Sequence, residues 1–183
     1  MNYKKIKISV LLLLLTSFAI AQSPKEVTAD LQKKIKQEIE KEIPAYKTDL
    51  EKKKLSPLEI EFTLDTFRVE RFMEKWIDND NSDLGMREAG YQTAKLYDAL
   101  LNKYYQKLLS KLKTADRNTL VQTQNNWIAF RDSEFRLVAT LSKEEYSGGG
   151  TAQQLNESGA YLELIKSRTI ALFEHLQRAT ELD

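Results

Sequence analysis

Histidine and cysteine, the side chains that most often carry catalysis or bind transition metals, are nearly absent from this sequence. The 183 residues contain one histidine, His175, and no cysteine. These counts exclude disulfides, a thiolate zinc site, an iron–sulfur cluster and a cysteine nucleophile, and a serine triad would have to use His175. No spacing of acidic residues singles out the carboxylate pair of a glycoside hydrolase. We therefore expect a protein that is not an enzyme and that holds no cofactor and no metal.

The strongest candidate for calcium binding is the acidic segment 78–83, which reads Asp-Asn-Asp-Asn-Ser-Asp. An EF-hand loop that starts at Asp78 needs glycine at its sixth position and glutamate at its twelfth. The chain has Asp83 and Ala89 at these positions. The segment is instead typical of an acidic turn between two helices, with Ser82 or Asp83 as the N-cap of the second helix.

Three of the six glycines stand together at positions 148–150, directly before a predicted helix. Because a helix N-terminus presents free N–H groups, such a run can hold an anion, but no Gly-Lys-Ser/Thr sequence marks a P-loop here. Thr151 and Gln154 have the spacing of a capping box. Two interpretations stay open, a flexible connection between helices or a loop that contacts a partner. The candidate partner-binding residues are Tyr146, Ser147, Gly148, Gly149, Gly150 and Thr151.

An arginine, Arg131, lies on the inward face of a predicted helix over residues 116–142. It follows Gln124 and Trp127 at spacings of three and four residues. A guanidinium that is removed from water must be paired with an acid. A buried ion-pair network that fixes the register of the helices is the favoured interpretation, and a ligand- or partner-binding site is the alternative. The possible acidic partners are Glu134, Asp98 and Glu70.

Hydrophobic periodicity predicts the helices that position these residues. Apolar side chains recur every four residues from Val27 to Ile43 among charged ones, which indicates an amphipathic helix that Pro44 should end or kink. Ser56, followed by Pro57 and by Glu59 three residues on, has the pattern of a capped helix start.

Further helices are predicted over residues 57–78, 83–113 and 116–142, and from position 151 toward the C-terminus. Their apolar residues recur at spacings of three and four, as in packed helices. The sequence therefore predicts an all-α, antiparallel helical bundle of four to five helices, with a glycine-rich loop before the last helix.

The first twenty-one residues have the pattern of a signal peptide. Three lysines precede an apolar stretch that closes with Ala19-Ile20-Ala21, a small-x-small cleavage pattern, so cleavage is expected before Gln22. The apolar stretch is shorter than the roughly 20 residues that a spanning helix needs, which makes an uncleaved anchor the less favoured alternative. We expect a periplasmic or secreted protein with no membrane span after cleavage.

The expected organisation is a signal peptide (1–21), a charged N-terminal helical segment (22–55) and a helical bundle domain (56–183). Cleavage removes three lysines and no acid, which changes the formal net charge from +1 to −2. Such a chain lacks the clustered basic residues that phosphate contacts need, so nucleic acid is not an expected partner. Because no cysteine is present, packing must supply the stability of the exported domain.

Five segments of the chain resemble, in order and spacing, the LprI-type lysozyme-inhibitor-like domain of bacterial envelope proteins. The densest motif is segment 124–134, with the pattern Gln-x-x-Trp-x-x-Phe-Arg-Asp-x-Glu. The other segments are Met86-Arg87-Glu88-Ala89, Tyr97 to Tyr105, Gly148 to Thr151 and Leu164 to Arg168, so the match covers roughly residues 86–176. The family-motif residues, expected to be structural, are Asp98, Asn102, Tyr104, Gln124, Trp127, Arg131, Asp132, Glu134 and Arg168.

This resemblance implies an exported, non-enzymatic protein that contacts a lysozyme-type muramidase. The alternative is a structural or ligand-binding envelope protein without lysozyme inhibition. Many members of the family carry cysteine where this chain has Ala89 and Phe135. Apolar packing is therefore expected at both positions in place of a disulfide.

Overall fold

A computed structural model describes residues 26–180 of the chain. The predicted all-α helical bundle is confirmed, since these residues form helices and no strand. In chain order the helices are α1 (Ala29–Lys52), α2 (Pro57–Asn79), α3 (Asp83–Lys111), α4 (Thr114–Leu141), α5 (Glu144–Ser147) and α6 (Thr151–Thr180). Within this range no helix has the length and apolarity needed to cross a bilayer. The predicted signal peptide lies outside the described residues.

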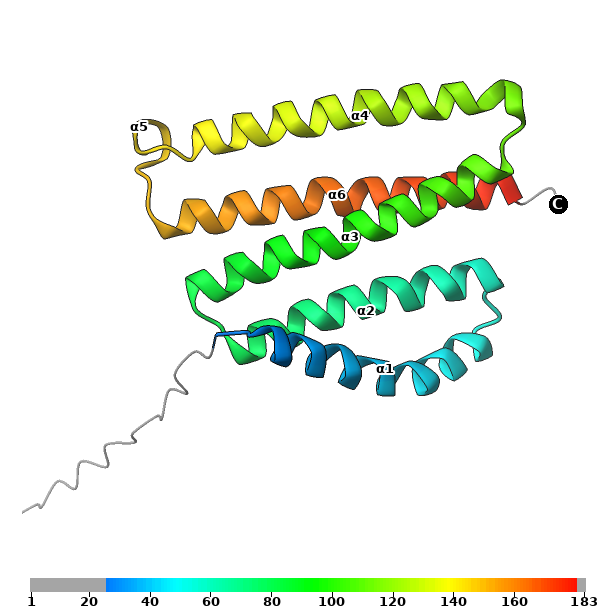
Figure 1. Ribbon diagram of the computed structural model, residues 1–183, viewed down its shortest axis with the longest axis horizontal. Helices are drawn as coiled ribbons and strands as arrows, with labels where there is room; N and C mark the ends of the chain where they lie inside the picture. Colours follow the sequence, from blue (N-terminus) through cyan, green and yellow to red (C-terminus); the bar gives the residue numbers. More distant parts are fainter. Residues whose placement is uncertain (1–25, 181–183) are drawn as a thin grey trace, which may run out of the picture.

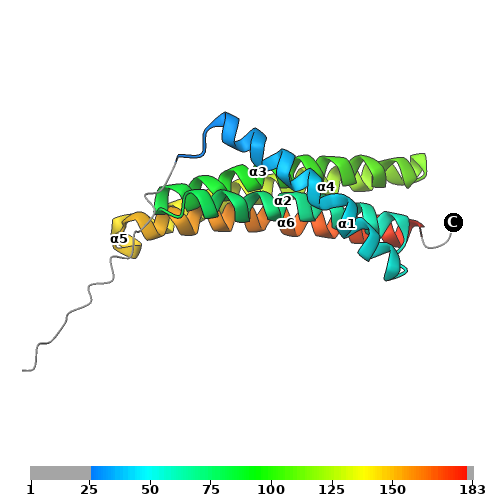
Figure 2. The same cartoon turned by 90° about the horizontal axis from the view of Figure 1, so that it is seen from below.

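The long helices lie side by side, and each runs antiparallel to the long helix before it in the chain (Figure 1). From one edge of the bundle to the other the order is α4, α6, α3, α2, and α1 crosses the outer side of α2 (Figures 1 and 2). The central pair, α3 and α6, run in the same direction because the chain returns through α4 between them. As a result α4 is an edge helix that packs mainly on α6.

The main apolar core lies between α3 and α6, with α2 covering it. Tyr104 of α3 and Leu172 of α6 have no exposed surface. The ring of Phe62 in α2 stacks on Phe173 of α6, with 3.8 Å between the ring centroids. At Gly90 the central pair approach so closely that a Cβ atom would lie 2.9 Å from the hydroxyl oxygen of Ser158 in α6. These two helices form the framework on which the other helices rest.

The helix termini follow from local chemistry. The predicted capping box is present, because the Ser56 hydroxyl accepts from the Glu59 N–H at 3.2 Å and the Ser56 N–H donates to the Glu59 carboxylate at 2.7 Å. At the start of α3, Ser82 is the N-cap, and its hydroxyl accepts from the Gly85 N–H at 3.0 Å. Pro44 lies inside α1, which continues past it and bends (Figure 1).

The charged N-terminal segment packs on α2. Ile35 and Ile39 of α1 are each 2% exposed and share an apolar cluster with Phe72 and Trp76 of α2. A row of ion pairs also joins the two helices: Arg68–Glu40, Arg71–Glu42, Lys75–Glu38 and Lys75–Glu42. The segment therefore lies on the outside of the bundle (Figure 1), and it is attached there by both apolar and ionic contacts.

Acidification is expected to weaken these contacts. The hydrogen bond from Arg71 lowers the pKa of Glu42. Burial raises the pKa of Glu61, but hydrogen bonds from Lys103 and Lys107 outweigh it, and the net pKa is lowered. A carboxyl group whose pKa is lowered on folding binds fewer protons in the folded state than in the unfolded state. It therefore stabilises the fold above its unfolded pKa of about 4.3, and this stabilisation is lost as the pH falls through the pKa of the folded state.

We therefore expect the urea midpoint to be lower at about pH 3 than at about pH 7. Unfolding followed by circular dichroism measures this difference. The double variant Glu42→Gln with Glu61→Gln should show a smaller pH dependence than the wild type. A double variant with undiminished pH dependence would show that other groups are responsible.

Candidate functional site

Five of the family-motif residues gather where α4 packs on α6. Two guanidinium groups lie near the Trp127 ring, with Cζ of Arg131 5.4 Å and Cζ of Arg168 5.9 Å from the ring centroid. Such arrangements stabilise a cation over an aromatic face. The five residues are Gln124, Trp127, Arg131 and Asp132 of α4 and Arg168 of α6.

Arg131 does not form the predicted buried ion pair. Its Nε and Nη2 donate to Oδ1 of the next residue, Asp132, at 2.8 and 2.7 Å, and its side chain is 20% exposed. The physical reason is the edge position of α4, which lets an inward-facing long side chain reach water beside α6. Within the described part of the chain none of the predicted partners pairs with Arg131: Glu134, Asp98 or Glu70.

The buried arginine of this contact is Arg168. It is 9% exposed, and its Nε donates to Oε1 of Gln124 at 3.1 Å. Its Nη2 is buried and has no hydrogen-bond partner among the described residues. Burial lowers the pKa of this guanidinium. The desolvated charge of the α4–α6 contact therefore comes from α6, whereas the sequence periodicity predicts a buried arginine on α4.

We expect Arg131→Ala to lower the free energy of unfolding by only about 1 kcal/mol, the scale of a partly exposed ion pair and a cation–π contact. Urea unfolding measures the change. The variant Asp132→Ala removes the ion pair but leaves the contact with Trp127, so it should cost less. A chain that fails to fold after Arg131→Ala would mean that this residue belongs to a buried network after all.

The remaining family-motif residues lie elsewhere. Asp98 and Asn102 of α3 and Glu134 of α4 are exposed or half-buried, and none takes part in the Trp127 contact. Tyr104 belongs to the core, where its hydroxyl donates to Oδ2 of Asp65 at 2.8 Å. Burial and this carboxylate raise the pKa of Tyr104. These positions do not form one site with the five residues on α4 and α6.

Two polar clusters that the sequence does not reveal link the helices. Asp65 of α2 accepts from Tyr104 and, at 2.5 Å, from Lys103. Glu70 of α2 accepts from Tyr97 and from Lys166 of α6, with 2.6 Å between Lys166 Nζ and Glu70 Oε1. No local signal identifies these groups, because the partners come from helices whose register is set only by the tertiary packing.

Apolar packing is present, as expected, at Ala89 and Phe135. Ala89 has no exposed surface and packs with the cluster around Trp76. The Phe135 ring lies 4.8 Å from Tyr161, which lies 6.2 Å from Tyr91, centroid to centroid. This chain of rings joins α4, α6 and α3 without a disulfide.

The segment between α4 and α6 is partly helical. Residues 144–147, which the sequence places in a loop, form the single turn α5, and Gly148 closes it with a φ of +77° and an N–H bond of 2.9 Å to the Glu144 carbonyl. Gly149 and Gly150 follow with φ values of +68° and +92°. Glycine adopts these left-handed conformations without the strain that a Cβ atom brings.

The predicted Thr151 capping box is replaced by contacts to α3. Thr151 is the first residue of α6, and its hydroxyl donates to Oδ2 of Asp83 at 2.8 Å. The side chain of Gln154 accepts from Arg87. Both side chains thus attach the start of α6 to the start of α3, and α5 stands at the same end of the bundle (Figure 1).

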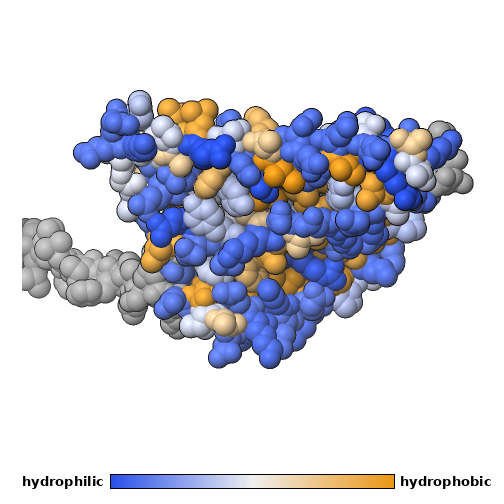
Figure 3. Space-filling view, turned by 45° about the horizontal axis from the view of Figure 1, so that its top comes forward, coloured by the Kyte–Doolittle hydropathy of each residue, from blue (hydrophilic) through white to orange (hydrophobic). Residues whose placement is uncertain are grey.

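Helix α4 exposes large apolar side chains. Phe130, Leu137 and Leu141, spaced by seven and four residues on one side of the helix, are 52%, 50% and 51% exposed. Tyr146, on the short turn α5 that follows α4, is 62% exposed. In Figure 3 apolar patches lie along the upper edge, where α4 runs. An apolar row of this kind is typical of a surface that contacts another protein.

Two acids, Glu144 and Glu145, accompany Tyr146 on α5 and are exposed. Neither forms an ion pair with a residue of the described range. We call the four apolar residues and these two acids the α4–α5 surface. Of the predicted loop residues, Tyr146 belongs to it, and the glycines at 148–150 follow directly.

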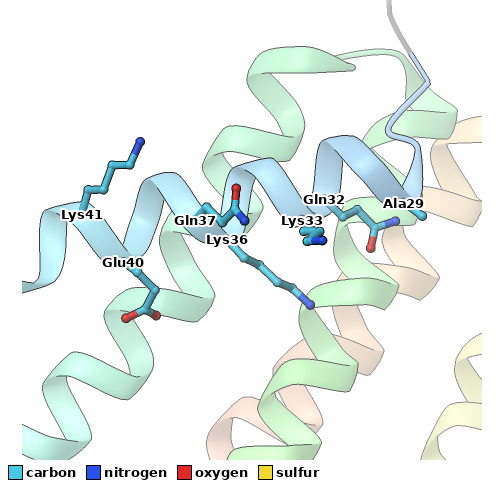
Figure 4. A pocket seen from close by; sticks show the side chains of 7 residues that line it. All are labelled: Ala29, Gln32, Lys33, Lys36, Gln37, Glu40 and Lys41. Carbon is cyan, nitrogen blue, oxygen red and sulfur yellow. The ribbon is translucent and has the colours of Figure 1, made fainter.

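Two other features do not form sites. A hollow along α1 is lined by that helix alone, with Lys36 and Glu40 pointing toward α2 and α3 and Lys41 away from them (Figure 4). In the acidic turn, Asp80 accepts from the Ser82 N–H at 3.1 Å and hydroxyl at 2.6 Å. Over residues 26–180 no group of three or more metal-binding side chains occurs.

Comparison with protein families gives a match to the model described as Lysozyme inhibitor LprI, over residues 77–172, which is just over half of the chain. The matched region starts near the end of α2 and contains α3, α4, α5 and most of α6. Comparison with curated proteins and with solved structures gives no match. The chain belongs to the lysozyme inhibitor LprI family.

Proposed function

We propose that the chain is exported, loses residues 1–21, and acts as a non-enzymatic inhibitor that binds a lysozyme-type muramidase. Membership of the lysozyme inhibitor LprI family supports this proposal. The observation that carries it is the α4–α5 surface, which combines an exposed apolar row on α4 with exposed Tyr146, Glu144 and Glu145 on α5. The row lies within the family region and belongs to its least buried long helix.

An inhibitor of a muramidase has to block the cleft in which the polysaccharide binds beside the two catalytic carboxylates. Tyr146, exposed on α5 at one end of the bundle, resembles the aromatic anchors that dominate the energetics of protein interfaces. The two acids would face a cationic partner, which favours rapid association at low salt. Gly148, Gly149 and Gly150, all with positive φ, follow α5 and connect it to α6.

The test is lysis of a cell-wall suspension by several types of lysozyme, with purified residues 22–183 titrated as inhibitor. We expect at least one lysozyme type to be inhibited, with saturation at a stoichiometric excess of the folded protein. Circular dichroism verifies the fold of each sample. Full lysis by every lysozyme type at micromolar excess of a folded sample would overturn the proposal.

A further inference from the structure

An open cleft of about 520 Å³ lies where α3, α4 and α6 meet, toward the end of the bundle remote from α5 (Figure 1). Small-molecule sites commonly occupy about 300–1,000 Å³. One wall is apolar, with Leu108 and Leu112 from the end of α3 and Leu120 from α4. The side from α6 is basic and includes Arg168. The cleft thus combines an apolar wall with a buried cation.

Arg168 is the distinctive group of this cleft. It is more than nine-tenths buried, and its Nη2 has no hydrogen-bond partner among the described residues. Its two contacts, the amide of Gln124 and the ring of Trp127, carry no negative charge. Buried charges are normally paired, and a guanidinium with a free donor group suits a carboxylate or phosphate oxygen.

The charges around the cleft favour a ligand with a single negative charge. Arg168 and Arg178 of α6 contribute two positive charges, and Asp116 of α4 contributes one negative charge. One positive charge is left, which matches a carboxylate better than a doubly charged phosphate.

We propose that this cleft binds a small amphiphilic carboxylate, with its charged group at Arg168 and its apolar chain against Leu108, Leu112 and Leu120. The site shares no residue with the α4–α5 surface and does not depend on lysozyme binding. It is therefore a second binding function of the same chain, and either function can fail without the other.

The test is isothermal titration of the exported chain, purified from cells that express the complete sequence, with four probes. Octanoate carries both the charge and the apolar chain, octanol only the chain, acetate only the charge, and octyl phosphate a larger charge. We expect octanoate to bind at least about tenfold more tightly than each of the other three. Octanol or octyl phosphate binding as tightly as octanoate would overturn the proposal, and so would the absence of octanoate binding.

Variants locate the site. Arg168→Gln should weaken octanoate binding by about tenfold, whereas Arg136→Gln, on an exposed arginine of α4 outside the cleft, should leave it unchanged. Because Arg168→Gln can affect folding, two exposed rim positions give independent evidence. Arg178→Glu should weaken binding and Asp116→Asn should tighten it, each by about threefold. Unchanged affinity in both rim variants would overturn the proposal whatever the outcome at Arg168.

Discussion

Tyr104→Ala is expected to lower the free energy of unfolding by about 3–5 kcal/mol, the scale for removing a buried aromatic ring. The Tyr104 side chain has no exposed surface, and its ring lies edge-on to Phe62 and Phe173 at centroid distances of 5.0 and 5.8 Å. The substitution creates a cavity where α2, α3 and α6 meet, and it removes the hydroxyl that donates to Asp65. Urea unfolding followed by circular dichroism measures the loss.

Two substitutions separate the causes. Tyr104→Phe keeps the ring and removes only the hydroxyl, so it should cost about 1–2 kcal/mol, because Asp65 keeps its bond to Lys103. Tyr146→Ala makes the same change at an exposed tyrosine and should cost less than about 0.5 kcal/mol. If Tyr104→Ala lowers the free energy of unfolding no more than Tyr146→Ala does, packing at the junction of the three helices does not dominate the stability of the bundle.

The same Tyr146→Ala variant should lose inhibition while it keeps its fold. If Tyr146 is the anchor of the α4–α5 surface, its removal should raise the concentration for half-inhibition of lysozyme by about tenfold or more. The paired change of Glu144→Gln and Glu145→Gln should have a smaller effect, which decreases as salt is added, because exposed charges act mainly on the association rate. Both are measured in the cell-wall lysis assay.

Leu84→Ala is the matched control for Tyr146→Ala. Leu84 is 58% exposed, close to the 62% of Tyr146, but it lies in the first turn of α3 beside a different cleft. This variant should inhibit as the wild type does. Equal losses in the two variants would show that general surface hydrophobicity, rather than the α4–α5 surface, governs inhibition.

Local sequence signals predicted the helices well because their causes are local. The Ser56–Glu59 capping box is formed by residues three apart, and α2 begins at Pro57 as expected. The start of α3 at Asp83 agrees with the sequence prediction. Spacings of three and four residues placed Leu120 and Gln124 of α4 correctly on the buried face, but they also placed Leu141 there, which is 51% exposed. The turn α5 was missed, although Gly148 after a short polar stretch has the position of a helix C′ glycine.

The arginines show what local signals cannot predict. Periodicity predicts which face of α4 carries Arg131, but it does not predict how much of that face a neighbouring helix covers. Because α4 is an edge helix, Arg131 reaches water and pairs with Asp132. Arg168 stands on a helix in the middle of the bundle and is buried. Burial is decided by the order of the helices across the bundle, which no single helix encodes.

The edge position of α4 also has a consequence for the timescale on which parts of the molecule open. Of its residues only Leu120 and Gln124 are buried, whereas α3 and α6 each bury at least seven. Backbone amides exchange with solvent through local opening, whose free energy follows the buried contacts that must be broken. Amides of α4 should therefore exchange with deuterium long before those of α3 and α6. The α4 part of the surface proposed to recognise lysozyme would then lie on the long helix of the family region whose amides are least protected. Binding of a partner to this surface should slow the deuterium exchange of the α4 amides.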